Sequence, residues 1–200
     1  MNAMKALRER IPEHAKDLRL NLDALSKVES LTPPQLWGTL LASALAARNA
    51  ELIRAVFEDA RAQLSNAALT AARTAAALMG MNNIYYRFVH LASNPEYGSL
   101  PARLRMQGLA NPGVDKLDFE LWSLAVSAVN GCGKCIDAHE RELRTGGASA
   151  LQVQDAVRIA AVLYAIAAVL DGEQALAGVL ENSVQEKDEP VAPVAFLRPS

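Results

Sequence analysis

The chain repeats a helical pattern at an offset of 85 residues, and this repeat limits its possible folds more than any other feature. The letters QLW at 35–37 match ELW at 120–122, and ARTAA at 72–76 matches VRIAA at 157–161. A shared tryptophan and a shared arginine at one register carry more information than matching alanines, which recur by chance. The sequence therefore predicts two copies of one helical unit, at about 30–80 and 115–165.

Residue usage favours an all-α fold. Alanine and leucine dominate, and runs of β-branched residues are scarce. Helices are expected at about 3–9, 12–28, 33–47, 49–63, 66–79, 81–91, 99–107, 115–129, 132–145, 149–169 and 173–184. We expect a single helical domain over 1–184. The segment 185–200 contains three prolines and shows no periodicity, so it is predicted to be a loose tail.

The totals exclude several classes of protein. Hydrophobic residues make up 51% of the chain and charged residues 21%, which is ordinary for a soluble domain. A net charge of −2 gives no basic surface for nucleic acid. We expect no membrane span, because no apolar run reaches the roughly 20 residues that a span needs. We expect no signal peptide, because the N-terminal residues alternate charges with single apolar residues. The sequence thus predicts a cytoplasmic protein, where a CxxC pair is more often catalytic or metal-binding than a structural disulfide.

Both cysteines lie in the segment AVNGCGKCIDAHEREL. Cys132, Cys135 and His139 are spaced by three and four residues, so on a helix they share one face. A helix that begins near Cys132 would stabilise a thiolate through its dipole and its N-terminal N–H groups, and Lys134 adds a positive charge. A neutral His139 imidazole one turn after Cys135 is placed to accept a thiol proton.

Glu120 is the candidate to orient His139. If the helices before and after Asn130-Gly131 form an antiparallel hairpin, Glu120 and His139 lie at similar distances from the turn and come level with each other. At the repeat offset the first copy lacks this chemistry: Glu120 falls on Gln35, Cys132 on Ala47, Cys135 on Ala50 and His139 on Arg54. The second copy is therefore predicted to be the reactive one.

Two other interpretations of the cysteines stay open on the residues alone. Buried cysteines often serve as small apolar core residues. A zinc site needs four ligands, or three and a water, and Cys132, Cys135, His139 and Glu120 are able to supply them, although no second CxxC or HxxxH occurs. Trp37 is predicted to be a packing residue, like its counterpart in the second copy.

The pattern E-x11-C-x2-C-x3-H, formed by Glu120, Cys132, Cys135 and His139, resembles that of the AhpD-type alkylhydroperoxidases. These belong to the carboxymuconolactone decarboxylase-like superfamily. The resemblance extends over most of the chain, including MNNIYYRFVHL at 81–91 and NPGVDKLDFELWSLAVSAVNGC at 111–132. It implies an all-helical fold, often a homotrimer, without a bound cofactor or metal.

The family resemblance also implies an activity and partners. The expected enzyme is a dithiol peroxidase that reduces organic hydroperoxides and passes electrons to a peroxiredoxin partner, AhpC. Its electrons would come from dihydrolipoamide, held on the lipoylated acyltransferase subunit of a 2-oxoacid dehydrogenase. Dihydrolipoamide dehydrogenase would reduce that lipoyl group again, with NADH as the original source of the electrons.

Site roles follow from the same resemblance. Cys135 would be the attacking thiolate that becomes a sulfenic acid, and Cys132 would protonate the leaving alcohol and then close the disulfide. His139 would act as base and relay, with Glu120 behind it. The family often has a histidine between the cysteines, where this chain has Lys134. A lysine lowers the pKa of a nearby thiol but does not relay protons near neutral pH as an imidazole does.

Three alternative functions are consistent with parts of the pattern. The protein would be a thiol–disulfide adaptor if its main duty were to reduce a partner protein. A decarboxylase-like enzyme acting on a lactone acid is the second alternative, although that chemistry has no use for two thiols. A metal-binding helical module is the third.

Overall fold

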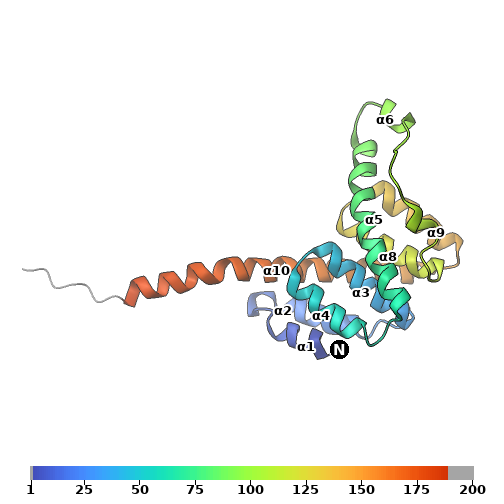
Figure 1. Ribbon diagram of the computed structural model, residues 1–200. Coiled ribbons are helices and arrows are strands. Elements are labelled where there is room, and N and C mark those ends of the chain that lie inside the picture. The colour runs from blue at the N-terminus through green and yellow to red at the C-terminus, as the bar shows by residue number, and fades with distance from the viewer. Residues whose placement is uncertain (1, 189–200) are drawn as a thin grey trace, which may run out of the picture.

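Two units with the same order of helices form the body of the protein (Figure 1). This computed structural model describes residues 2–188, and within them every regular element is a helix, as the sequence predicts. The first unit consists of α3 (Pro33–Ala47), α4 (Ala50–Ala60) and α5 (Asn66–Leu91). The second consists of α8 (Lys116–Val129), α9 (Gly133–Thr145) and α10 (Ala150–Asp188). In each unit two shorter helices precede a long one, in agreement with the repeat seen in the sequence.

The remaining helices are short and lie before and between the two units. α1 (Asn2–Glu9), a 3-10 turn (Glu13–Ala15) and α2 (Lys16–Leu25) precede the first unit. α6 (Glu96–Ser99) and α7 (Gln107–Ala110) lie in the connection between the units. The C-terminal half of α5 and the short α6 project from the body as one arm, and α10 projects in another direction (Figure 1).

The core forms where α3 and α8 pack against each other, with α5 and α10 on their flanks. Trp37 of α3 and Trp122 of α8 are both buried, so the tryptophan pair of the repeat consists of packing residues. Gly38 permits the close approach, because a Cβ atom at that position would lie 2.1 Å from Cε2 of Trp122. The absence of a side chain at Gly38 therefore leaves room for the Trp122 ring between α3 and α8.

Side-chain caps set the starts of several helices. Thr32 and Gln35 form a reciprocal capping box at the start of α3, and Asn49 and Ser65 accept backbone N–H groups at the starts of α4 and α5. At the start of α10, the Ser149 N–H donates to Gln152 Oε1 (2.8 Å) and the Gln152 N–H donates to Ser149 Oγ (3.2 Å). The capping interaction is worth about 1 kcal/mol at such a position.

Some predicted boundaries are wrong. α5 runs through Gly80 and α10 runs through Gly172, where the sequence suggested breaks. A glycine inside a helix costs only about 1 kcal/mol, which flanking alanines and tertiary packing outweigh. The helix expected over 99–107 does not form, because Pro101 drives Leu100 into an extended conformation (ψ 138°). α10 continues to Asp188, into the segment predicted as a tail, and the rest of that tail, 189–200, lies outside the described residues.

The length and apolarity of α10 also differ from expectation. Its segment Ala150–Ala177 is long and apolar enough to cross a membrane by length and composition, although charged residues interrupt its apolar run. Half of its most apolar stretch is buried inside the protein, and the helix packs against α3 and α8. Packing in the core is a sufficient reason for such a composition.

Asp118, in the first turn of α8, has a carboxyl group whose ionisation lowers the stability of the folded protein. Partial burial raises the pKa of Asp118, and the charge of Asp115 acts in the same direction, while a hydrogen bond from Gln35 opposes both. Because the folded state then binds a proton more readily than the unfolded state, stability falls as the pH rises above the unfolded pKa of about 3.9.

Replacing this carboxylate should stabilise the protein near neutral pH. We expect Asp118→Asn to raise the free energy of unfolding at pH 7, and we expect the gain to vanish at about pH 3, where both states are protonated. Urea unfolding at the two pH values measures this. Asp17→Asn, an exposed carboxylate in the first turn of α2, is the matched control and should show no gain. A gain for Asp118→Asn that persists at acid pH would contradict the assignment.

Candidate active site

A reversal of the chain at Asn130 and Gly131 joins α8 to α9 and places the candidate site. Gly131 has a φ of +66°, a left-handed conformation that glycine adopts without strain. The N–H of Cys132 returns to the carbonyl of Ser127 (3.1 Å), which closes the turn. α8 and α9 consequently pack side by side as a hairpin.

The two cysteines stand at the start of α9 and form a disulfide. Cys132 is the N-cap residue, and its carbonyl accepts the N–H groups of Cys135 (3.0 Å) and Ile136 (2.9 Å). Both cysteines are buried, Cys132 completely. This places the sulfurs at the positive end of the helix dipole, as the sequence predicts, and that position stabilises a thiolate once the disulfide is reduced.

Glu120 of α8 and His139 of α9 contact each other at hydrogen-bond distance across the hairpin. Glu120 Oε2 lies 2.7 Å from His139 Nδ1, and both side chains are about 85% buried, with 15% and 14% of their surface exposed. The predicted proximity of these two residues is therefore confirmed. A carboxylate on Nδ1 fixes the orientation of the ring.

The other ring nitrogen of His139 contacts a residue that the sequence did not single out. Met79 Sδ of α5 lies 3.1 Å from His139 Nε2, and Met79 is only 1% exposed. Sixty residues separate the two in the chain. No local spacing rule identifies such a contact, because it depends on how α5 packs against α9.

Asn83 of α5 holds the turn before the cysteines and was also missed. Its side-chain N–H donates to Ser127 Oγ (2.9 Å), and its carbonyl oxygen accepts from the Asn130 side chain (2.9 Å). One turn further along, Arg87 donates to the backbone carbonyl of Asn130 (2.7 Å). The available signal in the sequence was a pair of adjacent asparagines, Asn82 and Asn83, inside a predicted helix.

Lys134, between the cysteines, is exposed and turns toward an aromatic ring. Its Nζ lies 5.8 Å from the centre of the Tyr86 ring, within the range of a cation–π interaction. Tyr86 in turn packs edge-on against Tyr85. α5 therefore contributes Met79, Asn83, Tyr86 and Arg87 to the surroundings of the cysteines.

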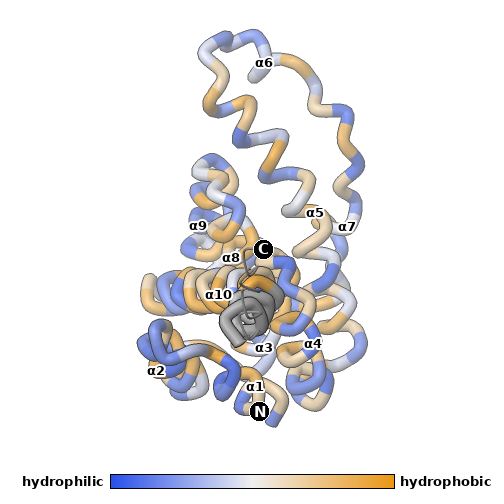
Figure 2. Tube along the Cα trace, turned by 90° about the vertical axis from the view of Figure 1, so that its left-hand side faces the viewer, coloured by the Kyte–Doolittle hydropathy of each residue, from blue (hydrophilic) through white to orange (hydrophobic). Residues whose placement is uncertain are grey.

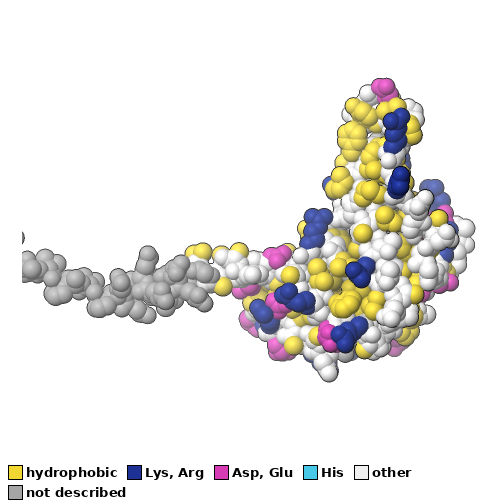
Figure 3. Space-filling model, in the orientation of Figure 1, with side chains coloured by type: hydrophobic (Ala, Val, Ile, Leu, Met, Phe, Trp, Pro, Cys, Tyr) yellow, Lys and Arg dark blue, Asp and Glu magenta, His cyan; other side chains and the backbone are white. Residues whose placement is uncertain are grey.

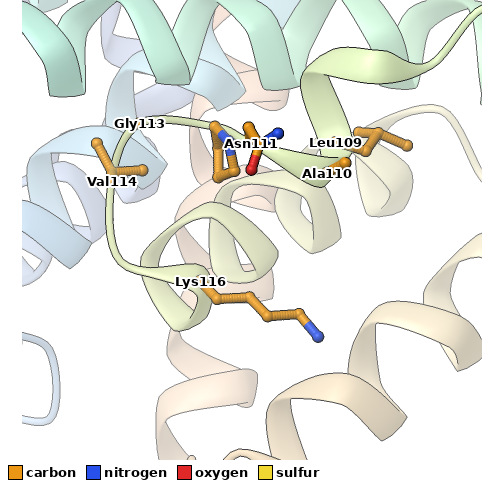
Figure 4. A pocket seen from close by; sticks show the side chains of 7 residues that line it. Leu109, Ala110, Asn111, Gly113, Val114 and Lys116 are labelled. Atoms are coloured by element: carbon orange, nitrogen blue, oxygen red, sulfur yellow. The ribbon is translucent and has the colours of Figure 1, made fainter.

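Two cavities lie near the hairpin. One of about 820 Å³ is lined by the segment 109–114 and by Lys116 at the start of α8 (Figure 4). Lys116 also pairs with Glu142 of α9, which raises the pKa of the lysine and lowers that of the glutamate. The second cavity, of about 510 Å³, includes Arg87 and Asn130 in its lining. In the described part of the chain, no three side chains from His, Cys, Asp and Glu are grouped to hold a metal ion.

The hydrogen bonds of Asn83 should contribute to stability as a buried network. Asn83→Ala leaves Ser127 and Asn130 without their partner, so we expect it to lower the free energy of unfolding by about 1–3 kcal/mol. Asn82→Ala is the matched control: this neighbouring side chain is also buried, and its Oδ1 has no hydrogen-bond partner among the described residues. Urea unfolding of the oxidised proteins measures both, and an equal loss in the two variants would contradict the network.

Comparison with known proteins shows the family of the chain. Residues 95–178 match the model of the carboxymuconolactone decarboxylase family. A protein named alkyl hydroperoxide reductase AhpD from Rhodospirillum centenum is 57% identical over 88% of this chain and 95% of its own length. Proteins of the same name from Maricaulis maris and Acidobacterium capsulatum are 59% and 58% identical over 86% and 83% of the chain, and over 99% and 91% of their own lengths. The chain therefore belongs to the AhpD-type proteins of the carboxymuconolactone decarboxylase family.

Proposed function

We propose that the protein reduces organic hydroperoxides through a thiol–disulfide cycle at Cys132 and Cys135. The observation that carries this proposal is the disulfide at the start of α9, one helical turn from the Glu120–His139 pair. A disulfide at a helix N-terminus beside an acid–base pair matches what a dithiol redox cycle requires. The shared name of the relatives, alkyl hydroperoxide reductase, indicates the same substrate class.

The cycle has three steps. The Cys135 thiolate attacks one oxygen of the hydroperoxide, the O–O bond breaks, and the departing alkoxide takes a proton from Cys132 to leave as the alcohol. The Cys132 thiolate then attacks the sulfur of the Cys135 sulfenic acid and forms the disulfide, and the displaced hydroxide takes up a proton from the solvent and leaves as water. Finally an external dithiol reduces the disulfide to two thiols and becomes a disulfide itself.

His139 and Glu120 manage the proton in this cycle. His139 accepts the Cys135 proton and Glu120 stabilises the resulting imidazolium through its contact with Nδ1. Lys134 adds a positive charge near the sulfurs, and its exposed position suits an electrostatic role better than proton transfer. The site has no need for a bound cofactor.

The reductant and protein partners form the wider part of the proposal. Dihydrolipoamide, carried by the acyltransferase subunit of a 2-oxoacid dehydrogenase and renewed by dihydrolipoamide dehydrogenase, is the proposed electron source in the cytoplasm. The proposed protein partner is the peroxiredoxin AhpC, which the disulfide cycle would regenerate. The name AhpD of the relatives supports an association with that system. Comparing rates on an alkyl hydroperoxide and on oxidised AhpC separates a peroxidase from a thiol–disulfide adaptor.

The two cysteines should have different roles that mutation separates. With dihydrolipoamide as reductant, we expect Cys135→Ser to reduce the turnover of cumene hydroperoxide to the uncatalysed rate. Cys132→Ser should stop after one attack and leave a sulfenic acid, which dimedone traps and mass spectrometry detects. The chain has no other cysteine that could substitute. Continued turnover by Cys135→Ser would contradict the proposal.

We also propose that the protein assembles as a homotrimer, with the projecting arm at the interface between copies. Large apolar side chains are exposed on the outer half of α5 and near it, among them Ile84 (57% exposed), Phe88 (50%) and Leu91 (70%). Figure 3 shows hydrophobic side chains gathered on this arm, and Figure 2 shows that hydrophobic and hydrophilic residues alternate along it. An amphipathic helix without a partner on its apolar face supports association.

Charges on this face should dissociate the assembly. We expect the wild-type protein to have three times the 21.4 kDa mass of the chain in light scattering, and Ile84→Glu/Phe88→Glu to have the monomer mass. Leu20→Glu, at a 63% exposed leucine on α2, is the control that should keep the wild-type mass. A folded double variant with the wild-type mass would contradict the interface, and a monomeric wild-type protein would contradict the trimer.

A further inference from the structure

The contact between Met79 and His139 limits where the proton of the imidazole can lie. His139 Nε2 is 3.1 Å from Met79 Sδ, while Nδ1 is 2.7 Å from Glu120 Oε2. Both ring nitrogens are thus engaged at hydrogen-bond distance, one with a carboxyl group and one with a thioether. Met79 is 1% exposed, so water does not compete for this contact.

A thioether sulfur has no proton to donate and acts only as an acceptor. For this contact to be a hydrogen bond, His139 Nε2 must carry the hydrogen. Two protonation states satisfy both contacts: an imidazolium between the Glu120 carboxylate and the sulfur, or a neutral Nε2–H ring that accepts a proton from a neutral Glu120 carboxyl group. In both, the proton that changes position lies between Nδ1 and Glu120.

We propose that Met79 is a positioning residue that keeps a proton on Nε2 of His139 while the disulfide is closed. Without the sulfur, a Glu120 carboxylate alone would favour the opposite neutral tautomer, with hydrogen on Nδ1 and a bare Nε2. That opposite tautomer is the usual arrangement when a carboxylate orients a histidine base. The methionine therefore reverses the default set by the glutamate.

The retained proton has a use when the disulfide opens, and this consequence rests on the proposed function. An attacking dithiol breaks the S–S bond, and the electron pair leaves on the departing cysteine sulfur as a thiolate. Because both ring nitrogens are already engaged, a His139 that holds this proton stabilises the thiolate through the positive charge of its imidazolium form. Met79 thus favours the state of His139 that the oxidised enzyme needs.

The alternative is that Met79 only fills space in the core, where it packs with the other buried apolar residues. Leucine has nearly the same volume and is well tolerated in place of methionine, but it has no acceptor atom. Selenomethionine keeps both the shape and the acceptor. The two replacements therefore separate packing from positioning.

Nitrogen-15 spectroscopy of the oxidised protein tests the proposal directly, because long-range proton–nitrogen correlations show which ring nitrogen carries hydrogen. We expect a protonated Nε2 in the wild-type and selenomethionine proteins, and a bare Nε2 in Met79→Leu. Met81→Leu, on the same helix, is the matched control and should behave as the wild type. A bare Nε2 in the wild type, or an unchanged Nε2 in Met79→Leu, would overturn the proposal.

The opening of the disulfide by excess dithiothreitol tests the consequence. We expect the disulfide of Met79→Leu to be reduced about tenfold more slowly than that of the wild type. The loss of one hydrogen bond to a charged group is large enough to cause a change of this size. An unchanged rate of disulfide reduction would show that the proton on His139 does not assist the departing thiolate. Neither measurement uses a peroxide, so a failure here is distinguishable from a failure of the peroxidase proposal.

Discussion

The reversal of the chain at Asn130 and Gly131 is the constraint on which the site depends. It turns α9 back along α8, brings His139 to Glu120 and places Cys132 at the N-cap of α9. A left-handed Gly131 makes the turn possible, and Asn83 holds it in place through two side-chain hydrogen bonds, one buried and one partly buried. Because buried polar groups cost free energy unless paired, this network also fixes one arrangement of the cysteines.

Both repeated units contribute residues to the candidate site, although their sequences indicate that only the second does. The second unit carries the cysteines, His139 and Glu120, as predicted. The first unit is nevertheless part of the site, because its long helix α5 supplies Met79 to His139 and Asn83 to the turn. The second unit thus carries the cysteines, and the first unit supplies residues that contact and orient the groups around them.

The predictable features are those set by neighbours in the chain. The spacing of Cys132, Cys135 and His139 identified one helix face, and equal distances from the turn identified Glu120 as the partner of His139. Met79 and Asn83 escaped prediction because their contacts span 60 and 44 residues and depend on packing between helices. The helix boundaries at Gly80 and Gly172 were wrong for the related reason that tertiary packing overrides the modest local cost of glycine.

The central claim is that Cys132 and Cys135 act together on one peroxide molecule. The most direct measurement adds a single equivalent of alkyl hydroperoxide to fully reduced protein, without reductant, and counts thiols, alcohol and disulfides. Our account predicts that two thiols disappear for each alcohol formed, and that peptide mapping finds the Cys132–Cys135 disulfide within one chain. Alcohol formation without loss of thiols, or disulfides only between chains, would contradict it.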